Sequence, residues 1–173
     1  MEQLKDLIRT IPDFPKKGIL YRDITTLLQD AAGFRAAVDK MCDPFLHEKI
    51  DVIAGIESRG FIFGSSMAVL LGTKFVPIRK KGKLPFTTVE ETYDLEYGTN
   101  TIEIHTDAII PGERVLIVDD LLATGGTVQA AVHLVEKQGG AITGVCVLVE
   151  LLALGARQKI DTTRVHSVIT YSD

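Results

Sequence analysis

The stretch RVLIVDDLLATGGTVQAA, at positions 114–131, carries the pattern that decides the fold. It begins with an apolar run that predicts a buried strand, and this run ends in two adjacent carboxylates, Asp119 and Asp120. A small, flexible turn (123–127) follows, and a helical pattern then continues to about Gln138. A strand, a glycine-containing turn and a helix in this order are typical of an α/β unit.

Similar strand and helix patterns recur on both sides of this unit. Strands are expected at 51–56, 74–79, 101–105, 141–150 and 165–170, and helices at 4–11, from Asp30 to about Met41, and at 61–71. Most of these strands are apolar throughout, which favours a mostly parallel sheet covered by helices on both faces. With no internal repeat and no second domain in view, we expect one α/β domain over residues 1–173.

One long segment, residues 80–98, interrupts the alternation. It is polar, lacks periodicity and contains Gly82 and Pro85. A segment of this length without secondary structure is usually a working loop in a compact domain, so we expect a lid here. Residues 1–30 are expected to form a short N-terminal hood.

Composition narrows the possible partners. The net charge of −4 and the pI of about 5.6 provide no general attraction for nucleic acid or for an anionic membrane, so any phosphate affinity must be local. No apolar run approaches bilayer length, and the first ten residues carry charges among their apolar residues and lack the uninterrupted apolar stretch of a signal peptide. Cys42 and Cys146 are expected to be buried, inert thiols. We therefore expect a cytoplasmic protein.

The turn after the apolar strand has the features of a monophosphate site. Gly125 and Gly126 allow the backbone to come close to a ligand, and Thr124 and Thr127 add hydroxyl donors beside a helix N-terminus. It is not a Walker loop, because no lysine follows the glycines. The neighbouring acidic pair would repel a phosphate unless it binds sugar hydroxyls or the water of a divalent cation. A phosphorylated ribose with Mg²⁺ satisfies all these groups.

VLIVDDLLATGGT resembles the phosphoribosyl-diphosphate motif of type I phosphoribosyltransferases. In that family the acidic pair hydrogen-bonds the ribose 2′- and 3′-hydroxyls, and the loop holds the 5′-phosphate. The resemblance therefore assigns the ribose to Asp119 and Asp120. It assigns the phosphate to Ala123, Thr124, Gly125, Gly126 and Thr127.

Two further segments match the diphosphate end of such a site. The turn Glu57-Ser58-Arg59-Gly60 resembles the family's pyrophosphate loop, in which a cis peptide between Glu57 and Ser58 is expected. The basic run 79–83 enters the lid, and it is either a solvated face or a set of cations for the departing pyrophosphate. The residues concerned are Ser58, Arg59, Arg79, Lys80 and Lys83. The family commonly forms homodimers, in which Arg79 or Lys80 would serve the partner's site.

The lid also resembles the adenine-specific members of the family, which carry similar KGKLP and YxLEYG segments. A closing lid would protect an oxocarbenium-like transition state from water, and a carboxylate on it would exchange a proton with the base. The resemblance assigns this proton transfer to Glu96 and places Tyr97 at the donor. For Glu90 and Glu91 we expect solvated charge.

The expected base pocket has two walls, one from the hood and one from the segment LVELLALGAR (148–157). PDFPKKGILYRDIT (12–25) resembles the hood of the adenine-specific enzymes, in which Leu20 and Arg22 would contribute main-chain contacts and Tyr21 would stack on the base. Phenylalanine is the expected residue at position 21, and tyrosine adds a hydroxyl that needs a partner. Leu151 would lie opposite the aromatic ring, with Glu150 near the base edge.

The base is indicated by two residues that this chain lacks. Enzymes for 6-oxopurines carry an aspartate where this chain has Ala123, and a late lysine that segment 145–152 lacks. The implied reaction joins adenine and 5-phosphoribosyl-1-diphosphate, giving AMP and pyrophosphate, with Mg²⁺ held mainly by the substrate. Two alternatives remain: a xanthine-type purine phosphoribosyltransferase, and a purine or phosphoribosyl-diphosphate sensor without catalysis. The four histidines receive no role, because they lack metal-ligand spacing.

Overall fold

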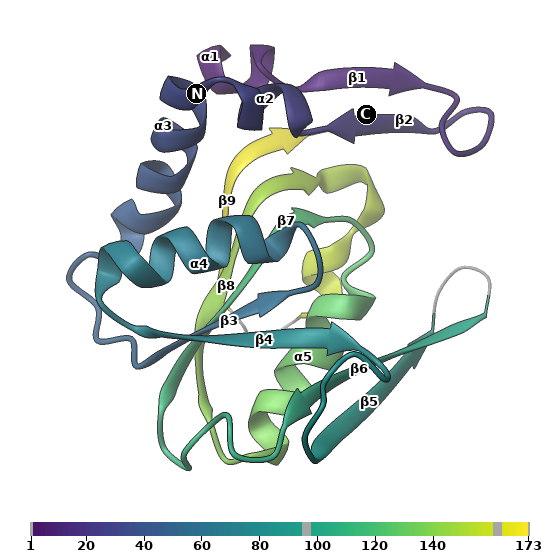
Figure 1. The fold of residues 1–173 in the computed structure, drawn as a ribbon. Coiled ribbons are helices and arrows are strands. Elements are labelled where there is room, and N and C mark those ends of the chain that lie inside the picture. The colour runs from purple at the N-terminus through teal and green to yellow at the C-terminus, as the bar shows by residue number, and fades with distance from the viewer. Residues whose placement is uncertain (1, 95–97, 161–163, 173) are drawn as a thin grey trace.

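A seven-stranded sheet forms the centre of the protein in this computed structural model, which describes residues 2–94, 98–160 and 164–172 (Figure 1). The strand order is β5-β6-β4-β3-β7-β8-β9. The strands are β3 (Val52–Ile56), β4 (Lys74–Lys80), β5 (Thr88–Asp94), β6 (Thr99–His105), β7 (Arg114–Leu122), β8 (Ala141–Leu151) and β9 (Val165–Tyr171). Five neighbouring strands run parallel to one another: β4, β3, β7, β8 and β9. At the β4 edge, β6 pairs antiparallel with β4, and β5 pairs antiparallel with β6. The predicted mostly parallel α/β fold is confirmed.

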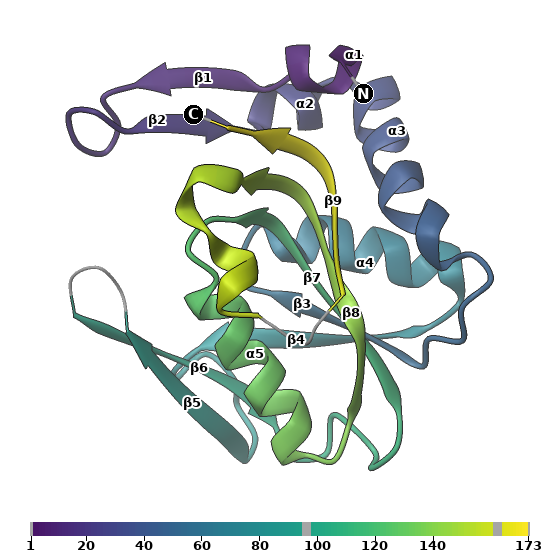
Figure 2. The ribbon, with the colours of Figure 1, turned by 180° about the vertical axis from the view of Figure 1, so that it is seen from behind.

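Helices cover both faces of the sheet, as the two opposite views show (Figures 1 and 2). On one face, α4 (Gly60–Leu71) packs on β3 and β7, with α3 (Ala31–Cys42) beside it; α5 (Gly126–Lys137) lies on the other face. The helix α3 begins where the sequence predicts, because the Asp30 side chain accepts a 2.7 Å hydrogen bond from the amide of Gly33. Shorter helices are α1 (Glu2–Asp6), α2 (Thr25–Gln29) and the 3₁₀ turns η1 (Asp43–Phe45), η2 (Leu152–Leu154) and η3 (Ala156–Gln158).

The central strands are apolar throughout because each of their faces lies in a core. Along β7, Leu116 and Val118 pack with α3 and α4, whereas Val115 and Ile117 pack with α5. All four side chains are fully buried. A strand buried on both sides needs apolar residues at every position, which explains why these runs do not alternate.

The N-terminal segment differs from its prediction. The helix expected over 4–11 ends at Asp6, and Ile11 lies in β1 (Arg9–Pro12), which pairs antiparallel with β2 (Leu20–Asp23). An isolated helix of eight residues is marginal in water, so pairing with a distant segment overrides the local pattern. This β1–β2 hairpin lies above the main sheet, at the top of Figure 1.

The lid segment differs as well. Residues 80–98 were expected to be irregular, but Thr88–Asp94 forms β5 and pairs with β6 along its whole length. Burial alternates along β5, since Val89, Glu91 and Tyr93 face inward and their neighbours face solvent. The sequence pattern missed this strand because one of the inward positions carries a charged residue.

Both cysteines are free and buried, as predicted. Burial, together with the nearby Asp39 and Asp43, raises the pKa of the Cys42 thiol to about 11, and burial also raises the pKa of Cys146. Raised pKa values leave little thiolate at neutral pH, so both thiols are unreactive. In the part of the chain that the structure describes, no helix is long and apolar enough to cross a membrane.

Candidate active site

Two loops meet at the carboxyl ends of β3 and β7, where ligands bind in open α/β sheets. The first, residues 57–60, leads from β3 into α4 and contains the expected cis peptide between Glu57 and Ser58. The first loop comes close to the end of β7 because position 60 has no side chain: a Cβ on Gly60 would lie 2.8 Å from Oδ1 of Asp119 and 2.9 Å from the carbonyl oxygen of Val118. Any larger residue would push this loop away from β7.

The second loop forms a small cradle. A cavity of about 80 Å³ is lined by the loop 123–127 together with Asp119, Leu121, Leu122 and Val128. This volume is several times the roughly 10–15 Å³ that one water needs, so it has room for a single tetrahedral anion. Gly125 adopts a φ of 83°, a conformation that suits glycine, directly before the first turn of α5. The free amides of that turn attract an anion.

The acidic pair lies between the two loops. Oδ1 of Asp119 accepts a hydrogen bond of 2.8 Å from the amide of Asp120. Burial raises the pKa of Asp119 well above its usual value, and the charge of Asp120 raises it further. Burial also raises the pKa of Asp120, while the positive charge of Arg59 opposes this shift. Such perturbed carboxylates at the mouth of a sheet mark a functional site.

Asp120 has unused hydrogen-bonding capacity. The residue is 5 % exposed, and Nε of Arg59 lies 2.9 Å from its Oδ2. Oδ2 nevertheless accepts no hydrogen bond from any residue that the structure describes, so the contact is a misaligned ion pair. A buried carboxylate with unmet acceptors needs hydroxyl or N–H donors, and the ribose of a donor substrate supplies hydroxyls.

Arg59 joins the acidic pair to the hood. Its Nη1 donates a 2.7 Å hydrogen bond to the hydroxyl of Tyr21, and the guanidinium carbon lies 5.6 Å from the centre of the Tyr21 ring. Ser58, the other residue expected at the pyrophosphate, is exposed on the same loop, and its carbonyl accepts from the amide of Phe61. The Tyr21 hydroxyl, which was expected to need a hydrogen-bond partner, thus has one in Arg59.

The basic run lies beside the first loop. Arg79 binds Oε2 of Glu57 through Nε at 3.0 Å, and its Nη1 donates to the carbonyl of Lys83. Lys80 contributes its amide to the same Glu57 carboxylate. The side chains of Lys80 and Lys83 are exposed and form no ion pair with any described residue, which leaves their charge available at this edge.

A buried carboxylate that sequence reasoning missed organises the same turn. Glu103 in β6 is 3 % exposed and accepts hydrogen bonds from the amides of Lys83 and Leu84 at 3.0 and 2.9 Å. Burial alone would raise its pKa, but the amide donors outweigh burial and hold the pKa below its usual value. The available signal was a single charge between Ile102 and Ile104, two apolar strand residues.

The three hood residues expected at the base are neighbours in β2. Leu20 is exposed, Tyr21 is half-buried, and Arg22 is buried with its guanidinium turned to Thr10 and to the ring of Tyr171. The main-chain contacts that the resemblance assigns to Leu20 and Arg22 remain a prediction. Phe14, which the sequence analysis did not select, packs edge-on against Tyr21 at a centroid distance of 5.1 Å.

Leu151, the residue predicted to lie opposite Tyr21, is half-buried at the end of β8. Its neighbour Glu150 is 2 % exposed and fully engaged, because Arg157 donates to both of its oxygens at 2.7 Å and the Ser167 hydroxyl donates to one. Arg157 lowers the pKa of Glu150 against the opposing effect of burial. The carboxylate therefore holds 3₁₀ turn η3 against β8 and β9, rather than facing a ligand.

The lid strand is docked on α5. The hydroxyl of Thr127 donates to that of Tyr93 at 3.1 Å, and Glu91 pairs with Lys137 and with His133. The expectation of solvated charge is wrong for Glu91, and Glu90 pairs with Lys81 on the exposed side. Glu96 and Tyr97 lie outside the described residues.

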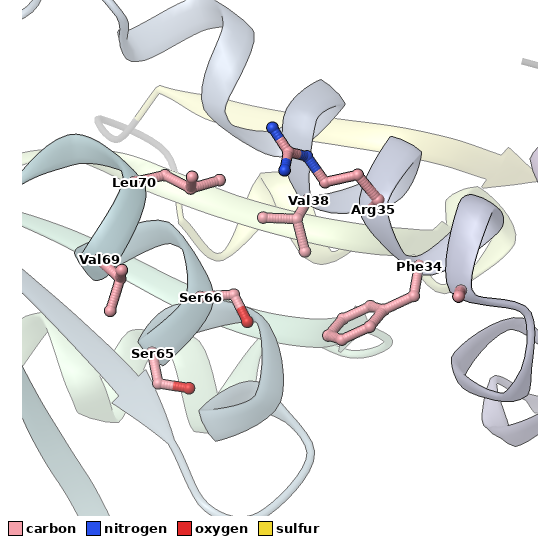
Figure 3. Close-up of a pocket in the computed structure, with 8 residues that line it drawn as sticks. Phe34, Arg35, Val38, Ser65, Ser66, Val69 and Leu70 are labelled. Carbon is pink, nitrogen blue, oxygen red and sulfur yellow. The ribbon is translucent and has the colours of Figure 1, made fainter.

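A larger concavity, of about 510 Å³, lies away from these loops (Figure 3). It separates α3 from α4 and is lined mainly by apolar side chains, among them Phe34, Val38, Val69 and Leu70. It does not lie at the carboxyl ends of the strands, so it is not part of the candidate site. Across residues 2–94, 98–160 and 164–172, no group of three or more His, Cys, Asp or Glu is placed to hold a metal ion.

Comparison with known proteins agrees with this geometry. Residues 23–172 match the model of the phosphoribosyl transferase domain. The chain is 57% identical over 158 residues to the adenine phosphoribosyltransferase of Parvibaculum lavamentivorans, covering 91% of this chain and 90% of that protein.

Solved structures give the same result. The adenine phosphoribosyltransferase of Thermoanaerobacter pseudethanolicus superposes with a TM-score of 0.96 at 49% identity, covering 98% of this chain and 99% of that one. The enzyme of Saccharomyces cerevisiae, in complex with an imino-altritol bisphosphate and adenine, gives a TM-score of 0.91 at 38% identity, covering 96% and 97% of the two chains. The chain therefore belongs to the adenine phosphoribosyltransferase family.

Proposed function

We propose that this protein transfers the 5-phosphoribosyl group of 5-phosphoribosyl-1-diphosphate to adenine, giving AMP and pyrophosphate in purine salvage. The observation that carries the proposal is the acidic pair beside the 80 Å³ cradle, in which Asp120 is buried and Asp119 lines the cavity. A carboxylate with unused acceptor sites next to an anion cradle is complementary to a phosphorylated ribose. The names of the relatives favour adenine over the xanthine-type and sensor alternatives.

The donor would span the two loops. Residues 123–127 hold the 5′-phosphate through loop amides and the hydroxyls of Thr124 and Thr127, and Asp119 and Asp120 accept from the ribose hydroxyls. Ser58 and Arg59 meet the diphosphate from the first loop, with Arg79, Lys80 and Lys83 supplying positive charge beside it. Arg79 is held in place by Glu57, so its charge is fixed before the donor binds.

Mg²⁺ fits this donor set as a substrate-bound ion. Two carboxylates and no histidine or thiolate suit a hard cation with oxygen ligands, and without a protein cage its remaining ligands would be diphosphate and ribose oxygens. The bound ion would neutralise charge on the leaving pyrophosphate.

Adenine would lie between the Tyr21 ring and Leu151, with main-chain groups of Leu20 and Arg22 at its edge. In the reaction a ring nitrogen of adenine forms a bond to C1 of the ribose while the C1–oxygen bond to the diphosphate breaks. The attacking nitrogen must lose its proton, and we assign this proton to the carboxylate of Glu96. Tyr97 would help the lid to cover the donor and exclude water.

A base panel tests the function directly. The protein is incubated with the diphosphate donor and with adenine, hypoxanthine, guanine or xanthine, each with and without Mg²⁺, and nucleotide formation is followed by chromatography. We expect AMP from adenine with Mg²⁺ and no nucleotide from the other bases. Consumption of xanthine would favour the xanthine-type alternative, and donor binding without any nucleotide would favour the sensor.

Glu96→Gln tests the proton transfer. The amide keeps the size of the side chain but accepts no proton, so kcat should fall by about 10²-fold or more, the usual scale of general acid–base help. Donor affinity, measured by calorimetry, should change little. Glu90→Gln, in β5, is the control and should retain its turnover, whereas unchanged turnover in Glu96→Gln would remove Glu96 from the mechanism.

We further propose that the protein is a homodimer and acts in the cytoplasm. The exposed Val69 and Leu70, at the apolar groove of α4, support self-association, because exposed apolar patches mark interfaces. The two free, buried thiols suit a reducing compartment. Sedimentation velocity across a tenfold range of protein concentration tests the dimer, and a monomer throughout that range would contradict it.

A further inference from the structure

Tyr21 has two chemically different contacts. Its ring packs against Phe14 in the hood and forms the wall proposed for adenine, while its hydroxyl accepts from Nη1 of Arg59 at 2.7 Å. Arg59 in turn approaches Asp120 through Nε at 2.9 Å. The Arg59 side chain therefore connects Tyr21 in β2, which forms the wall proposed for adenine, to Asp120 near the end of β7.

The guanidinium of Arg59 is held at two of its three nitrogens. Nε faces the Asp120 carboxylate and Nη1 faces the Tyr21 hydroxyl, whereas Nη2 has no hydrogen-bond partner in the described part of the chain. The Arg59 side chain is 32% exposed and that of Asp120 is 6% exposed, so the carboxylate lies beneath the guanidinium, which remains open to the site. A planar group fixed at two corners presents its third corner in one direction.

We propose that the Tyr21 hydroxyl is a positioning group for the donor: it fixes Arg59 so that Nη2 is aimed at an anionic oxygen of the diphosphate. This inference rests on the proposed function and adds to it a role for the hydroxyl that is separate from base stacking. A guanidinium fixed before binding loses less rotational freedom when the anion arrives, which strengthens donor binding.

The same contact also keeps Asp120 in place. Oδ2 of Asp120 faces Arg59 but accepts no hydrogen bond from a described residue, so this carboxylate keeps acceptor capacity for a ribose hydroxyl. If Arg59 were released, two neighbouring carboxylates would lose the positive charge beside them. The Tyr21 hydroxyl therefore acts on both the diphosphate and the ribose contacts.

The effect should be moderate rather than absolute. The resemblance to the family predicts phenylalanine at position 21, so the reaction does not require the hydroxyl, and the positioning contact is a feature of this chain. Loss of one partly exposed hydrogen bond to a charged group should weaken donor binding by about five- to tenfold.

The test is Tyr21→Phe, which keeps the ring and removes the hydroxyl. Binding of 5-phosphoribosyl-1-diphosphate with Mg²⁺ is measured by calorimetry without adenine, and KM for adenine is measured at saturating donor. We expect donor binding to weaken about five- to tenfold and the KM for adenine to change less than twofold. Phe14→Leu is the matched control: it removes the ring edge beside Tyr21, leaves the hydroxyl, and should keep donor affinity within twofold of the wild type.

A double-mutant cycle with Arg59→Lys shows whether the hydroxyl acts through Arg59. Lysine keeps the charge beside Asp120, but a single ammonium cannot present a guanidinium's fixed geometry to both partners. In this background Tyr21→Phe should have no further effect on donor affinity. Equal effects of Tyr21→Phe in both backgrounds, or unchanged or tighter donor binding in the single variant, would overturn the inference. If the wild type itself binds no donor, the proposed function fails instead.

Discussion

At the scale of single residues, the site is built from groups that constrain one another. Asp119 is half-buried beside Gly60, Asp120 is buried beneath Arg59, and Arg59 reaches Tyr21. Two adjacent carboxylates are costly to bury, and they are tolerable here because a guanidinium and backbone amides lie next to them. A ligand with hydroxyls and a phosphate would satisfy the polar groups that the protein leaves unpaired.

Asp120→Asn tests this interpretation. The amide preserves the shape but replaces a charged acceptor, so a ribose hydroxyl loses its charge-assisted hydrogen bond, which weakens donor binding by about 1.5–3 kcal/mol. Calorimetric titration with the donor and Mg²⁺ measures this loss. Asp39→Asn, on the exposed surface of α3, serves as the control; wild-type affinity in Asp120→Asn would contradict the ribose assignment.

At the scale of elements, the antiparallel edge of the sheet supports the basic turn. The hairpin of β5 and β6 is held to α5 by Glu91, and the turn after β4 is held by Glu103. Figures 1 and 2 show this hairpin and the β1–β2 hood extending from the same side of the molecule. The position of Lys83 therefore depends on a residue 20 positions further along the chain.

Glu103→Gln should loosen this turn. The amide group of glutamine would bring N–H donors against the amides of Lys83 and Leu84, so we expect the free energy of unfolding to fall by about 1.5–3 kcal/mol, the scale of hydrogen bonds to charged groups. Urea unfolding followed by circular dichroism measures this loss.

Glu90, the cross-strand neighbour of Glu103, provides the matched control. Its ion pair with Lys81 is exposed, so Glu90→Gln should cost less than about 1 kcal/mol. Equal losses in both variants would show that burial of Glu103 has no special effect.

At the scale of the whole molecule, the sheet is fastened at the end opposite to the site. Asp51 precedes β3 and Arg114 begins β7, and the Arg114 side chain donates to both oxygens of Asp51 at 2.9 Å. The Arg114 amide donates to the same carboxylate. These hydrogen bonds lower the pKa of Asp51 to about 2. The pair aligns the two strands whose far ends carry the active-site loops.

This lowered pKa gives a pH-dependent prediction. Because the folded pKa lies below the unfolded value of about 3.9, the Asp51 carboxylate stabilises the fold above that value and loses this contribution as the pH falls toward 2. Asp51→Asn should therefore have a lower urea midpoint than the wild type at pH 6, and the difference should shrink as the pH is lowered from 5 to 3. In an Arg114→Leu background only the backbone amide at position 114 still donates to Asp51, so the substitution should change the pH dependence less than it does in the wild type. A constant difference between Asp51→Asn and the wild type at every pH would contradict the role of the carboxylate.

The amino-acid sequence alone was enough to predict the parallel core and the loops that follow β3 and β7. Uniformly apolar strands require burial on both faces, and the glycines of the cradle and the acids before it are contiguous in the chain, so local chemistry was enough to predict them. The cis peptide at Glu57–Ser58 was also expected, through the resemblance to the family, and it is present.

Only the tertiary structure decided the features that depend on distant partners. β1 replaced part of a predicted helix because it pairs with β2, and β5 replaced a predicted loop because β6 and α5 cover it. The partners of Tyr21 and Glu103 lie 38 and about 20 positions away in the chain, so no local pattern shows them. Their hydrogen bonds form only when separate loops meet, and those meetings are set by how the strands are ordered in the sheet.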